Sequence, residues 1–442
     1  MQYILLLISF VLAAIMYVVP ADAIQVIVEA QLFVYVAMVV ANYLAERRIN
    51  LLQVWIVAYI FIIHSEMLIL ADMGDIFEYL SPFFLFLMSN NLVLLGYYIS
   101  KRKAKPINNV VEYQVENKPL FALLIIVSLA IFVYGSIQNV RDNLLLGRQL
   151  DDAVGSAKLG AMFIDSIGIM LPSLIAFLFK DVRGKVKWLQ LLFVIPIFII
   201  HIILATRFKL LFSLIPYCIV SGMIDVVKVS WQRMVALLAI AIGVTTLSSF
   251  MKENRYMSMT ELSYDNYVID EYENSKWSVK LGVQMSPEGV LQMAKYADDY
   301  FSSHDLTYGK ECANLLYRWV PRKLWNNKPK PLDHWLIRYY EDVSEAHSTS
   351  SGFIGVFRAD FGWFALLFAV LLGLLLKRLD VYALETCEYK STSLEIIMAS
   401  LMFSYVFFMV RSPITATYIL LYEYIVYVMI RTLTTIKVKK EF

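Results

Sequence analysis

The chain alternates between long apolar runs and short polar connections that carry most of its charge. A run of about twenty apolar residues is long enough to cross a bilayer as a helix. Lipid offers backbone polar groups no partners, so each crossing run must be helical. The pattern predicts about twelve membrane spans, at residues 2–19, 23–44, 51–70, 77–99, 119–138, 159–180, 188–206, 208–227, 232–250, 352–376, 393–410 and 413–431.

The predicted fold class is therefore all-α, a polytopic membrane protein with one large helical loop. Only residues 251–351 form a polar segment long enough for a soluble-like subdomain, and they include the amphipathic stretches PEGVLQMAKYADDYFS and PLDHWLIRYYEDVSEA. The predicted organisation is residues 1–250 with spans one to nine, the loop 251–351, and residues 352–442 with spans ten to twelve and a cytoplasmic tail.

The distribution of Lys and Arg predicts the orientation. If the N-terminus is cytoplasmic, the inner segments hold about twenty Lys and Arg and the short outer connections about six, which is the asymmetry of the positive-inside rule. Both termini are then cytoplasmic and the loop 251–351 lies outside, because long loops cross the membrane largely regardless of charge.

Composition supports a membrane protein and argues against metal chemistry. The chain is 59% hydrophobic and only 17% charged, with a net charge of +2, whereas soluble proteins are about half apolar and a quarter charged. The three cysteines fall in a span, an outer loop and an inner loop, so they form no disulfide framework and no Cys/His metal spacing. No D-x-D motif occurs, and nothing resembles a nucleic-acid module. We expect neither a metal nor a cofactor.

Two arginines lie at the same predicted depth, at the outer membrane boundary. Arg207, in "ATRFKLLF" with Lys209, is at the joint between spans seven and eight, and Arg411, in "FFMVRSPITATY", is at the joint between spans eleven and twelve. A single arginine there can simply reach a lipid phosphate. Two guanidinium groups at one depth also suit a diphosphate, which they can bind bidentately.

The loop carries two further candidates. "LLYRWVPRKLWNNKPKPLDHW" interleaves cations such as Arg322 and Lys328 with tryptophans such as Trp325. These side chains could bind sugars and phosphates, or form an interfacial belt on the lipid surface. His347, in "SEAHSTSSGF", could act as acid, base or hydrogen-bond donor near neutral pH, or have no role.

Charged groups inside or near the spans have simpler expected roles. Arg358 and Asp360, about two turns into span ten, are expected to pair with each other or with a neighbouring helix. Four other ionisable groups are expected to be packed, hydrogen-bonded polar groups rather than a proton relay: Glu29, His64, Glu66 and Asp165.

The order and spacing of these motifs resemble those of the Wzy polymerases of bacterial polysaccharide assembly, with the enterobacterial common antigen branch as the nearest comparison. The likeness rests on the T-R dipeptide that opens span eight, the large late outer loop, "VPRKLWNNKP", and "HS" followed by "FG" where the chain leads into the next span. It covers residues 200–415 best. Ala205 stands where the family pattern usually has glycine.

The resemblance implies an inverting, metal-independent glycosyltransferase of the membrane-embedded, GT-C-like type. It would polymerise undecaprenyl diphosphate-linked oligosaccharide repeat units into O-antigen or a similar polysaccharide of lipopolysaccharide biosynthesis, at the periplasmic face of the bacterial inner membrane. Donor, acceptor and membrane lipids are the implied partners, and a chain-length regulator stays open. The implied catalytic residues are Arg207, His347 and Arg411, and the implied diphosphate- and sugar-binding residues are Arg322, Lys328, Lys209 and Trp325.

Two alternative functions stay open at this stage. The related O-antigen ligase, which transfers polysaccharide to lipid A core, shares the spans, the late loop and a basic outer site. A transporter or flippase of lipid-linked oligosaccharides is less favoured, because it predicts internal repeats and polar groups at mid-membrane depth.

Overall fold

A computed structural model gives the fold of the chain. It describes residues 1–72, 76–100, 109–146, 159–182, 184–203, 207–227, 275–284, 289–317, 320, 324–325, 327–343 and 349–441.

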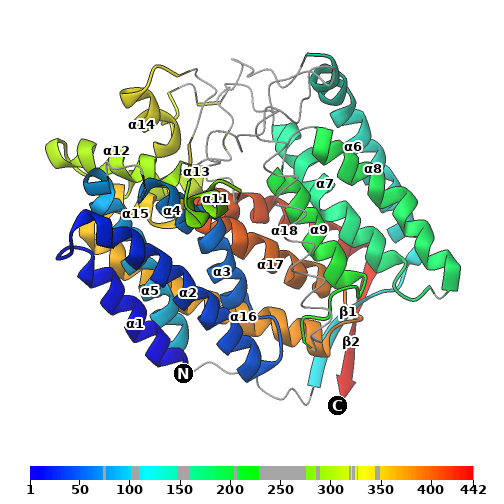
Figure 1. The fold of residues 1–442 in the computed structure, drawn as a ribbon. Coiled ribbons are helices and arrows are strands. Elements are labelled where there is room, and N and C mark those ends of the chain that lie inside the picture. The colour runs from blue at the N-terminus through cyan, green and yellow to red at the C-terminus, as the bar shows by residue number, and fades with distance from the viewer. Residues whose placement is uncertain are drawn as a thin grey trace.

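The first half is a series of helices interrupted by one strand (Figure 1). Its elements are α1 (Gln2–Ile15), α2 (Ala21–Glu46), α3 (Leu51–Tyr59), η1 (Ile60–His64), α4 (Ser65–Leu70), η2 (Ile76–Tyr79), α5 (Leu80–Ile99), β1 (Asn109–Val115), α6 (Lys118–Leu146), α7 (Leu159–Leu178), η4 (Gly184–Leu189), α8 (Gln190–Ile203) and α9 (Arg207–Val220).

The second half contains four short helices, then the C-terminal helices and a last strand. Its elements are α11 (Trp277–Gln284), α12 (Val290–Ser303), α13 (Lys310–Tyr317), α14 (Leu332–Tyr340), α15 (Gly352–Phe361), η6 (Gly362–Phe364), α16 (Ala365–Tyr389), α17 (Glu395–Arg411), α18 (Pro413–Thr434) and β2 (Thr435–Glu441).

Within the described residues, six helical segments are long and apolar enough to cross a membrane. They are Ala23–Glu46, Leu51–Leu70, Phe77–Ile99, Lys118–Ile137, Gly352–Tyr389 and Pro413–Thr434. Four shorter apolar helices accompany them: Gln2–Ile15, Ile164–Leu178, Gln190–Ile203 and Lys209–Val220. The chain is thus a multi-pass membrane protein in outline. The number twelve stays a prediction, and the predicted span 232–250 lies outside the described residues.

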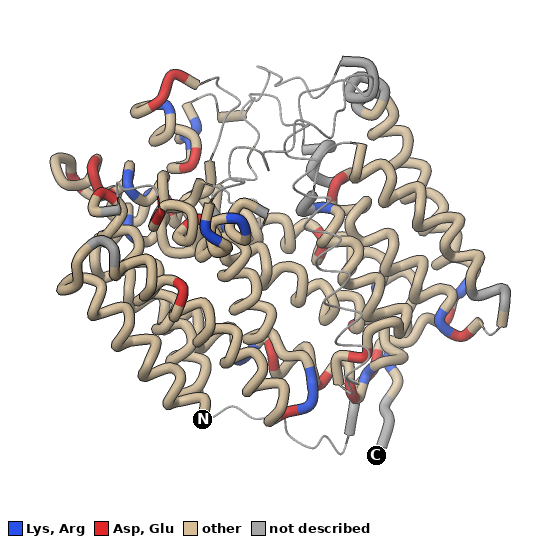
Figure 2. The backbone as a smooth tube through the Cα atoms, in the orientation of Figure 1, with Lys and Arg blue, Asp and Glu red and all other residues tan. Residues whose placement is uncertain are grey.

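The two ends of the helical body differ in composition from its middle. Both termini lie at one end, which we call the terminal end, and α12, α13 and α14 lie at the opposite end, which we call the loop end (Figure 1). Most of the described Lys, Arg, Asp and Glu lie toward these two ends, with a nearly uncharged band between them (Figure 2). The termini and these three helices thus lie at opposite ends of the body, and which end faces the cytoplasm stays a prediction.

The all-α prediction misses one small sheet. β1 pairs antiparallel with β2, in a register that runs from Asn109 opposite Glu441 to Val115 opposite Thr435. β1 lies in the polar connection between two predicted spans, and β2 lies in the predicted cytoplasmic tail. Strand pairing here depends on two segments more than 300 residues apart meeting at the terminal end, which a local pattern does not predict.

The predicted single span 352–376 is two helices. α15 ends at Phe361, and Gly362 has φ 59° and ψ −137°, a conformation that glycine accepts more readily than any other residue. A short 3₁₀ turn then leads into α16. The break lets α15 pack against the helices of the loop end while α16 continues through the apolar band.

Helices α5 and α16 cross with their backbones in contact. A Cβ atom on Gly373 would collide with the backbone carbonyl oxygen of Val93, and one on Gly96 would collide with that of Val370. Small residues at such crossings allow the close packing that holds helices together in lipid, where the hydrophobic effect between helices is absent.

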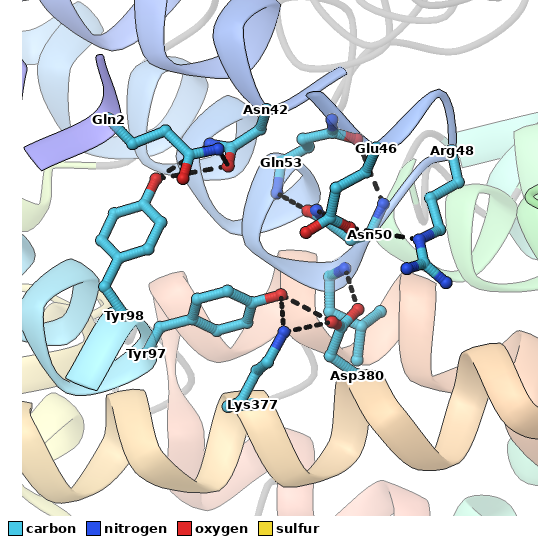
Figure 3. Close-up of polar contacts among 11 residues, drawn as sticks. Gln2, Asn42, Glu46, Arg48, Asn50, Gln53, Tyr97, Tyr98, Lys377 and Asp380 are labelled. Carbon is cyan, nitrogen blue, oxygen red and sulfur yellow. Dashed lines mark hydrogen bonds and ion pairs between the residues drawn. The ribbon is translucent and has the colours of Figure 1, made fainter. Parts of the chain in front are cut away.

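A buried polar cluster joins five helices at the terminal end (Figure 3). The Asp380 carboxylate on α16 accepts hydrogen bonds from the Leu51 backbone N–H (2.8 Å) and the Tyr97 hydroxyl (2.5 Å), and pairs with Lys377 (3.5 Å). Lys377 also donates to the Tyr97 hydroxyl (3.1 Å). A buried carboxylate needs such partners, because an unpaired charge there would be strongly destabilising.

Side chains around this carboxylate fix the neighbouring helices. Asn50 and Gln53 form a capping box at the start of α3, and Asn50 also donates to the Glu46 carboxylate (3.3 Å). Gln2 donates to Asn42 (2.6 Å), which ties α1 to α2 (Figure 3). The terminal end is therefore a rigid base from which the helices extend toward the loop end.

Candidate functional site

Helices α9 and α17 lie antiparallel and side by side. The Phe212 ring of α9 stacks on Tyr405 (centroids 5.1 Å apart) and meets Phe408 edge-on (5.0 Å), both on α17. The segment after α9 returns to the terminal end, where Val226 accepts a hydrogen bond from Ile49. Helix α17 begins beside β1, at that same end. The first residue of α9 and the last residue of α17 therefore both lie toward the loop end.

These two residues are the arginines that the sequence singles out. Arg207 opens α9, although its side chain lies outside the described part, and Arg411 closes α17. Antiparallel packing of α9 and α17 thus brings Arg207 and Arg411 to one end of one helix pair.

The Arg411 guanidinium is half-buried among groups of the loop segment. It lies over the Phe408 ring (5.5 Å to the centroid), and its Nε is shielded from solvent. It interacts electrostatically with the Asp333 carboxylate of α14. Its backbone carbonyl accepts a hydrogen bond from the Ser350 hydroxyl. The end of a membrane helix is in this way attached to the loop.

Asp333 connects this arginine to the start of α15. One carboxylate oxygen accepts the Ser351 N–H (3.2 Å), and the Asp333 backbone carbonyl accepts the Thr349 N–H (3.3 Å). We define the Arg411 site by these residues: Arg411, Asp333, Thr349, Ser350 and Ser351. A guanidinium can bind phosphate oxygens through charge-assisted hydrogen bonds, and a carboxylate or hydroxyl can hydrogen-bond the hydroxyl groups of a ligand.

Three of the predicted site residues have described side-chain contacts with residues other than those of the Arg411 site. Lys209 pairs with Asp165 of α7 (2.7 Å), and the Lys328 ammonium donates to the Val320 carbonyl (2.9 Å). The Trp325 ring is 40% exposed and packs edge-on against Tyr317 (5.3 Å). Trp325 therefore keeps an accessible face for stacking.

The remaining predicted residues lie outside the part of the chain whose side chains are described. They are Arg207, Arg322 and His347. Their roles stay predictions. His347 precedes Thr349, a member of the Arg411 site, by two positions in the sequence.

Sequence reasoning missed Asp333. In "KPKPLDHW" an acid two positions after Pro331 looks like an ordinary first-turn residue that complements the dipole of its own helix. Its carboxylate instead accepts the Ser351 N–H at the start of another helix and interacts electrostatically with Arg411. Only the tertiary contact between α14, α15 and α17 could reveal this, since no local signal distinguishes the two roles.

Carboxylates from elsewhere in the chain cap the helices of the loop end. Glu66 of α4 accepts the Leu291 N–H at the start of α12 (3.1 Å), and Asp360 of α15 accepts the Cys312 N–H of α13 (2.7 Å). Glu311 of α13 accepts the Leu332 N–H of α14 (2.9 Å). A carboxylate at a helix N-terminus satisfies an orphan N–H and complements the helix dipole.

The charged groups predicted in or near the spans have partners in the structure. Arg358 and Asp360 pair with neighbouring helices: Arg358 contacts Asp298 of α12 (2.9 Å), and Asp360 also binds the Thr307 hydroxyl (2.5 Å). Arg358 and Asp360 lie at different positions around α15, so each side chain contacts a different neighbouring segment. Glu66 and Asp165 are partnered as described above, and the His64 ring contacts the Val28 carbonyl (2.9 Å).

Burial changes the proton affinity of Glu311. Removal from water raises the pKa of its carboxyl above the ordinary value of 4.5, and the nearby Asp360 charge raises the pKa further. Hydrogen bonds from Trp335, Leu332 and Asn314 act in the opposite direction without cancelling this increase. The folded protein therefore binds a proton at Glu311 more tightly than the unfolded chain does.

This shift predicts a pH dependence. We expect the contribution of Glu311 to the free energy of unfolding to be greatest below pH 4.5 and to fall as the pH rises through the folded pKa, because an ionised carboxylate must then be buried. Thermal unfolding between about pH 4 and about pH 8 measures this slope. Glu311→Gln should flatten it, whereas Asp342→Asn, at an exposed carboxyl of the same segment, should not. Equal slopes in all three proteins would contradict this assignment.

The described residues contain no group of three or more His, Cys, Asp or Glu side chains that could hold a metal ion. Metal independence therefore stays a prediction of the sequence. The three cysteines are free thiols.

Comparison of the chain with known protein families, with curated proteins and with solved structures gives no match.

Proposed function

We propose that the chain is an inverting glycosyltransferase that polymerises undecaprenyl diphosphate-linked oligosaccharide repeat units at the periplasmic face of the bacterial inner membrane. The observation that carries the proposal is the position of Arg411, at the end of an apolar helix and beside the Asp333 carboxylate and the Ser350 hydroxyl of the loop. A polyprenyl diphosphate presents its charge at this level, where its isoprenoid chain enters the lipid.

In the proposed mechanism, Arg411 and Arg207 bind the donor diphosphate. Breaking the glycosidic bond leaves negative charge on this leaving group, so preorganised guanidinium groups stabilise the transition state more than the ground state. The acceptor hydroxyl attacks the anomeric carbon from the opposite face, which inverts its configuration. Arg322 and Lys328 assist in binding the phosphates, with Lys209 as a nearby cation, and Trp325 stacks on a sugar ring.

The remaining groups act on the acceptor. His347 orients the acceptor hydroxyl or takes its proton. Asp333 is a positioning residue, because its carboxylate interacts electrostatically with Arg411 and accepts the Ser351 N–H at the start of α15. No metal is required in this scheme, because the guanidinium groups supply the positive charge.

The test is turnover by the purified full chain with undecaprenyl diphosphate-linked repeat units, resolved as a ladder on a gel. A ladder that is unchanged by chelator supports the proposal. Transfer of a preformed polysaccharide to lipid A core oligosaccharide, without a ladder, would identify a ligase instead. Transbilayer movement of the lipid-linked units without a new glycosidic bond would identify a transporter.

A further inference from the structure

A cavity of about 300 Å³ is lined by residues of β1, α6, α7 and the segments that follow α7 and α16. Figure 1 shows β1 at the terminal end of the helical body. The cavity lies where α6 begins, α7 ends, and the connection between α16 and α17 passes β1. Its lining includes Lys118, Lys180, Asp181, Phe121, Phe177 and Leu178. This volume is at the lower limit of small-ligand sites, and none of these residues belongs to the Arg411 site.

The cavity combines two cations with an exposed and weakly held carboxylate. Lys118 and Asp181 are 3.4 Å apart, but their side chains are 67% and 80% exposed. An ion pair this open to water contributes little, so Lys118 can exchange Asp181 for another anion at small cost. The Lys180 ammonium donates to the Ser391 carbonyl and lies over the Phe177 ring (6.0 Å), which holds it at the cavity wall.

A second carboxylate lies behind the lining. One Glu112 oxygen accepts hydrogen bonds from Gln114 (3.0 Å) and Thr392 (2.8 Å), and both of these residues line the cavity. Glu112 is fully buried. The Gln114 and Thr392 side chains, rather than the Glu112 carboxylate, are therefore in contact with an anion in the cavity.

The floor of the cavity is apolar. The Phe121 and Phe177 rings meet edge-on at 6.0 Å, and Leu178 lies beside them. A free inorganic anion gains nothing from such a floor. A molecule with a phosphate attached to an apolar body gains from both parts of the lining.

Helix α6, which begins at the cavity, is largely exposed along its length. Lys118–Ile137 is one of the six segments long and apolar enough to cross a membrane, and only 22% of its apolar window is buried in the protein. Leu123 and Ile126 of this helix are 54% and 62% exposed. Acyl chains can therefore pack along α6 below a headgroup held at Lys118.

We propose that this cavity binds the phosphate headgroup of a membrane glycerophospholipid, with Lys118 and Lys180 on the phosphate and the acyl chains along α6. Basic pockets beside membrane helices bind anionic lipid headgroups in this way. The bound lipid would join α6, α7 and the β1–β2 ribbon. This site is at the opposite end of the molecule from the Arg411 site, so it does not depend on the proposed glycosyl transfer.

The experiment uses the purified full chain in neutral detergent, freed of lipid and analysed by native mass spectrometry. Three probes are added separately: phosphatidylglycerol, diacylglycerol with the same acyl chains, and inorganic phosphate. We expect one phosphatidylglycerol to bind with clear preference over the other two. Equal retention of diacylglycerol would show an apolar groove only, and equal binding of phosphate would show a soluble-anion site; either result would overturn the proposal.

Variants locate the binding site. Lys118→Ala, at an exposed side chain that should tolerate substitution, is expected to weaken phosphatidylglycerol binding about tenfold, as loss of one charge-assisted contact predicts. Lys180→Ala should weaken phosphatidylglycerol binding at least as much. If the Lys180→Ala protein does not fold, the result for Lys118→Ala alone tests the proposed site. Lys310→Ala, at an exposed lysine of the loop end, is the matched control. Unchanged lipid occupancy in Lys118→Ala would refute the proposed site.

Discussion

Arg411→Ala is expected to reduce turnover of lipid-linked repeat units by about 100-fold or more, because removing one preorganised donor to a developing anion typically costs that much. In cells the variant should accumulate single-repeat products. Arg411→Lys should retain part of the activity, since it keeps the charge but loses the planar fork that binds a diphosphate through two hydrogen bonds. The measurement is the initial rate of ladder formation by proteins purified at equal yield.

The control for this experiment is Arg431→Ala. Arg431 is near the C-terminal end of α18, where its guanidinium lies over the Tyr113 ring (4.5 Å), so its loss tests the general effect of removing an arginine from the helical body. We expect near-normal turnover. Normal long-chain product from Arg411→Ala would exclude a diphosphate-binding role for this residue.

Asp333→Asn separates the charge of Asp333 from its capping role. The amide oxygen can still accept the Ser351 N–H, so the start of α15 should be preserved. Loss of the negative charge facing Arg411 should alter binding of the donor diphosphate, seen as a change in KM together with kcat. An unchanged KM and kcat would leave Asp333 with a purely structural role.

Gly373→Ala is expected to destabilise the helical body by about 2–3 kcal/mol, because the new Cβ collides with the Val93 carbonyl and forces α5 and α16 apart. Backbone atoms cannot rotate away as a side chain can. Thermal unfolding in detergent should show a melting temperature lower by several degrees. The polar cluster around Asp380, which bridges the same two helices, should loosen as a consequence.

Gly135→Ala on α6 is the matched substitution. Its Cβ would meet the Cδ1 atom of Ile164 at 2.7 Å, the far end of a flexible side chain that can change rotamer. Alanine also favours the helix over glycine by up to about 1 kcal/mol. We therefore expect little change or a slight gain in stability. Equal losses in the two variants would mean that backbone contact is not what makes Gly373 necessary.

Helix positions are the part of the fold that the sequence predicts well. Every predicted span whose residues are described overlaps a helix, because a long apolar run is constrained by lipid to satisfy its own backbone. The irregular elements are not predictable in this way. The β1–β2 ribbon depends on pairing between distant segments. The π-helical turn Ile60–His64 and the break at Gly362 interrupt apolar runs that look continuous in the sequence.

The candidate site is predictable only in part, for the same physical reason. Arg411 is recognisable because an arginine between two apolar runs is costly unless it lies at a membrane boundary. Asp333 is not recognisable, since its role depends on where α14 packs. Lys209 resembles a free cation in the sequence, yet it pairs with Asp165 of a different helix.

The capping carboxylates of the loop end limit how this protein can be engineered. The starts of α12 and α13 are completed by Glu66 and Asp360, which belong to helices outside residues 289–343. Grafting this segment onto another membrane scaffold would leave the backbone N–H groups at the starts of α12 and α13 without these acceptors, unless Glu66 and Asp360 are transferred as well. The segment is thus not an exchangeable module, and chimeras that aim to transfer its specificity must take their boundaries from the hydrogen-bond network rather than from the polar stretch of the sequence.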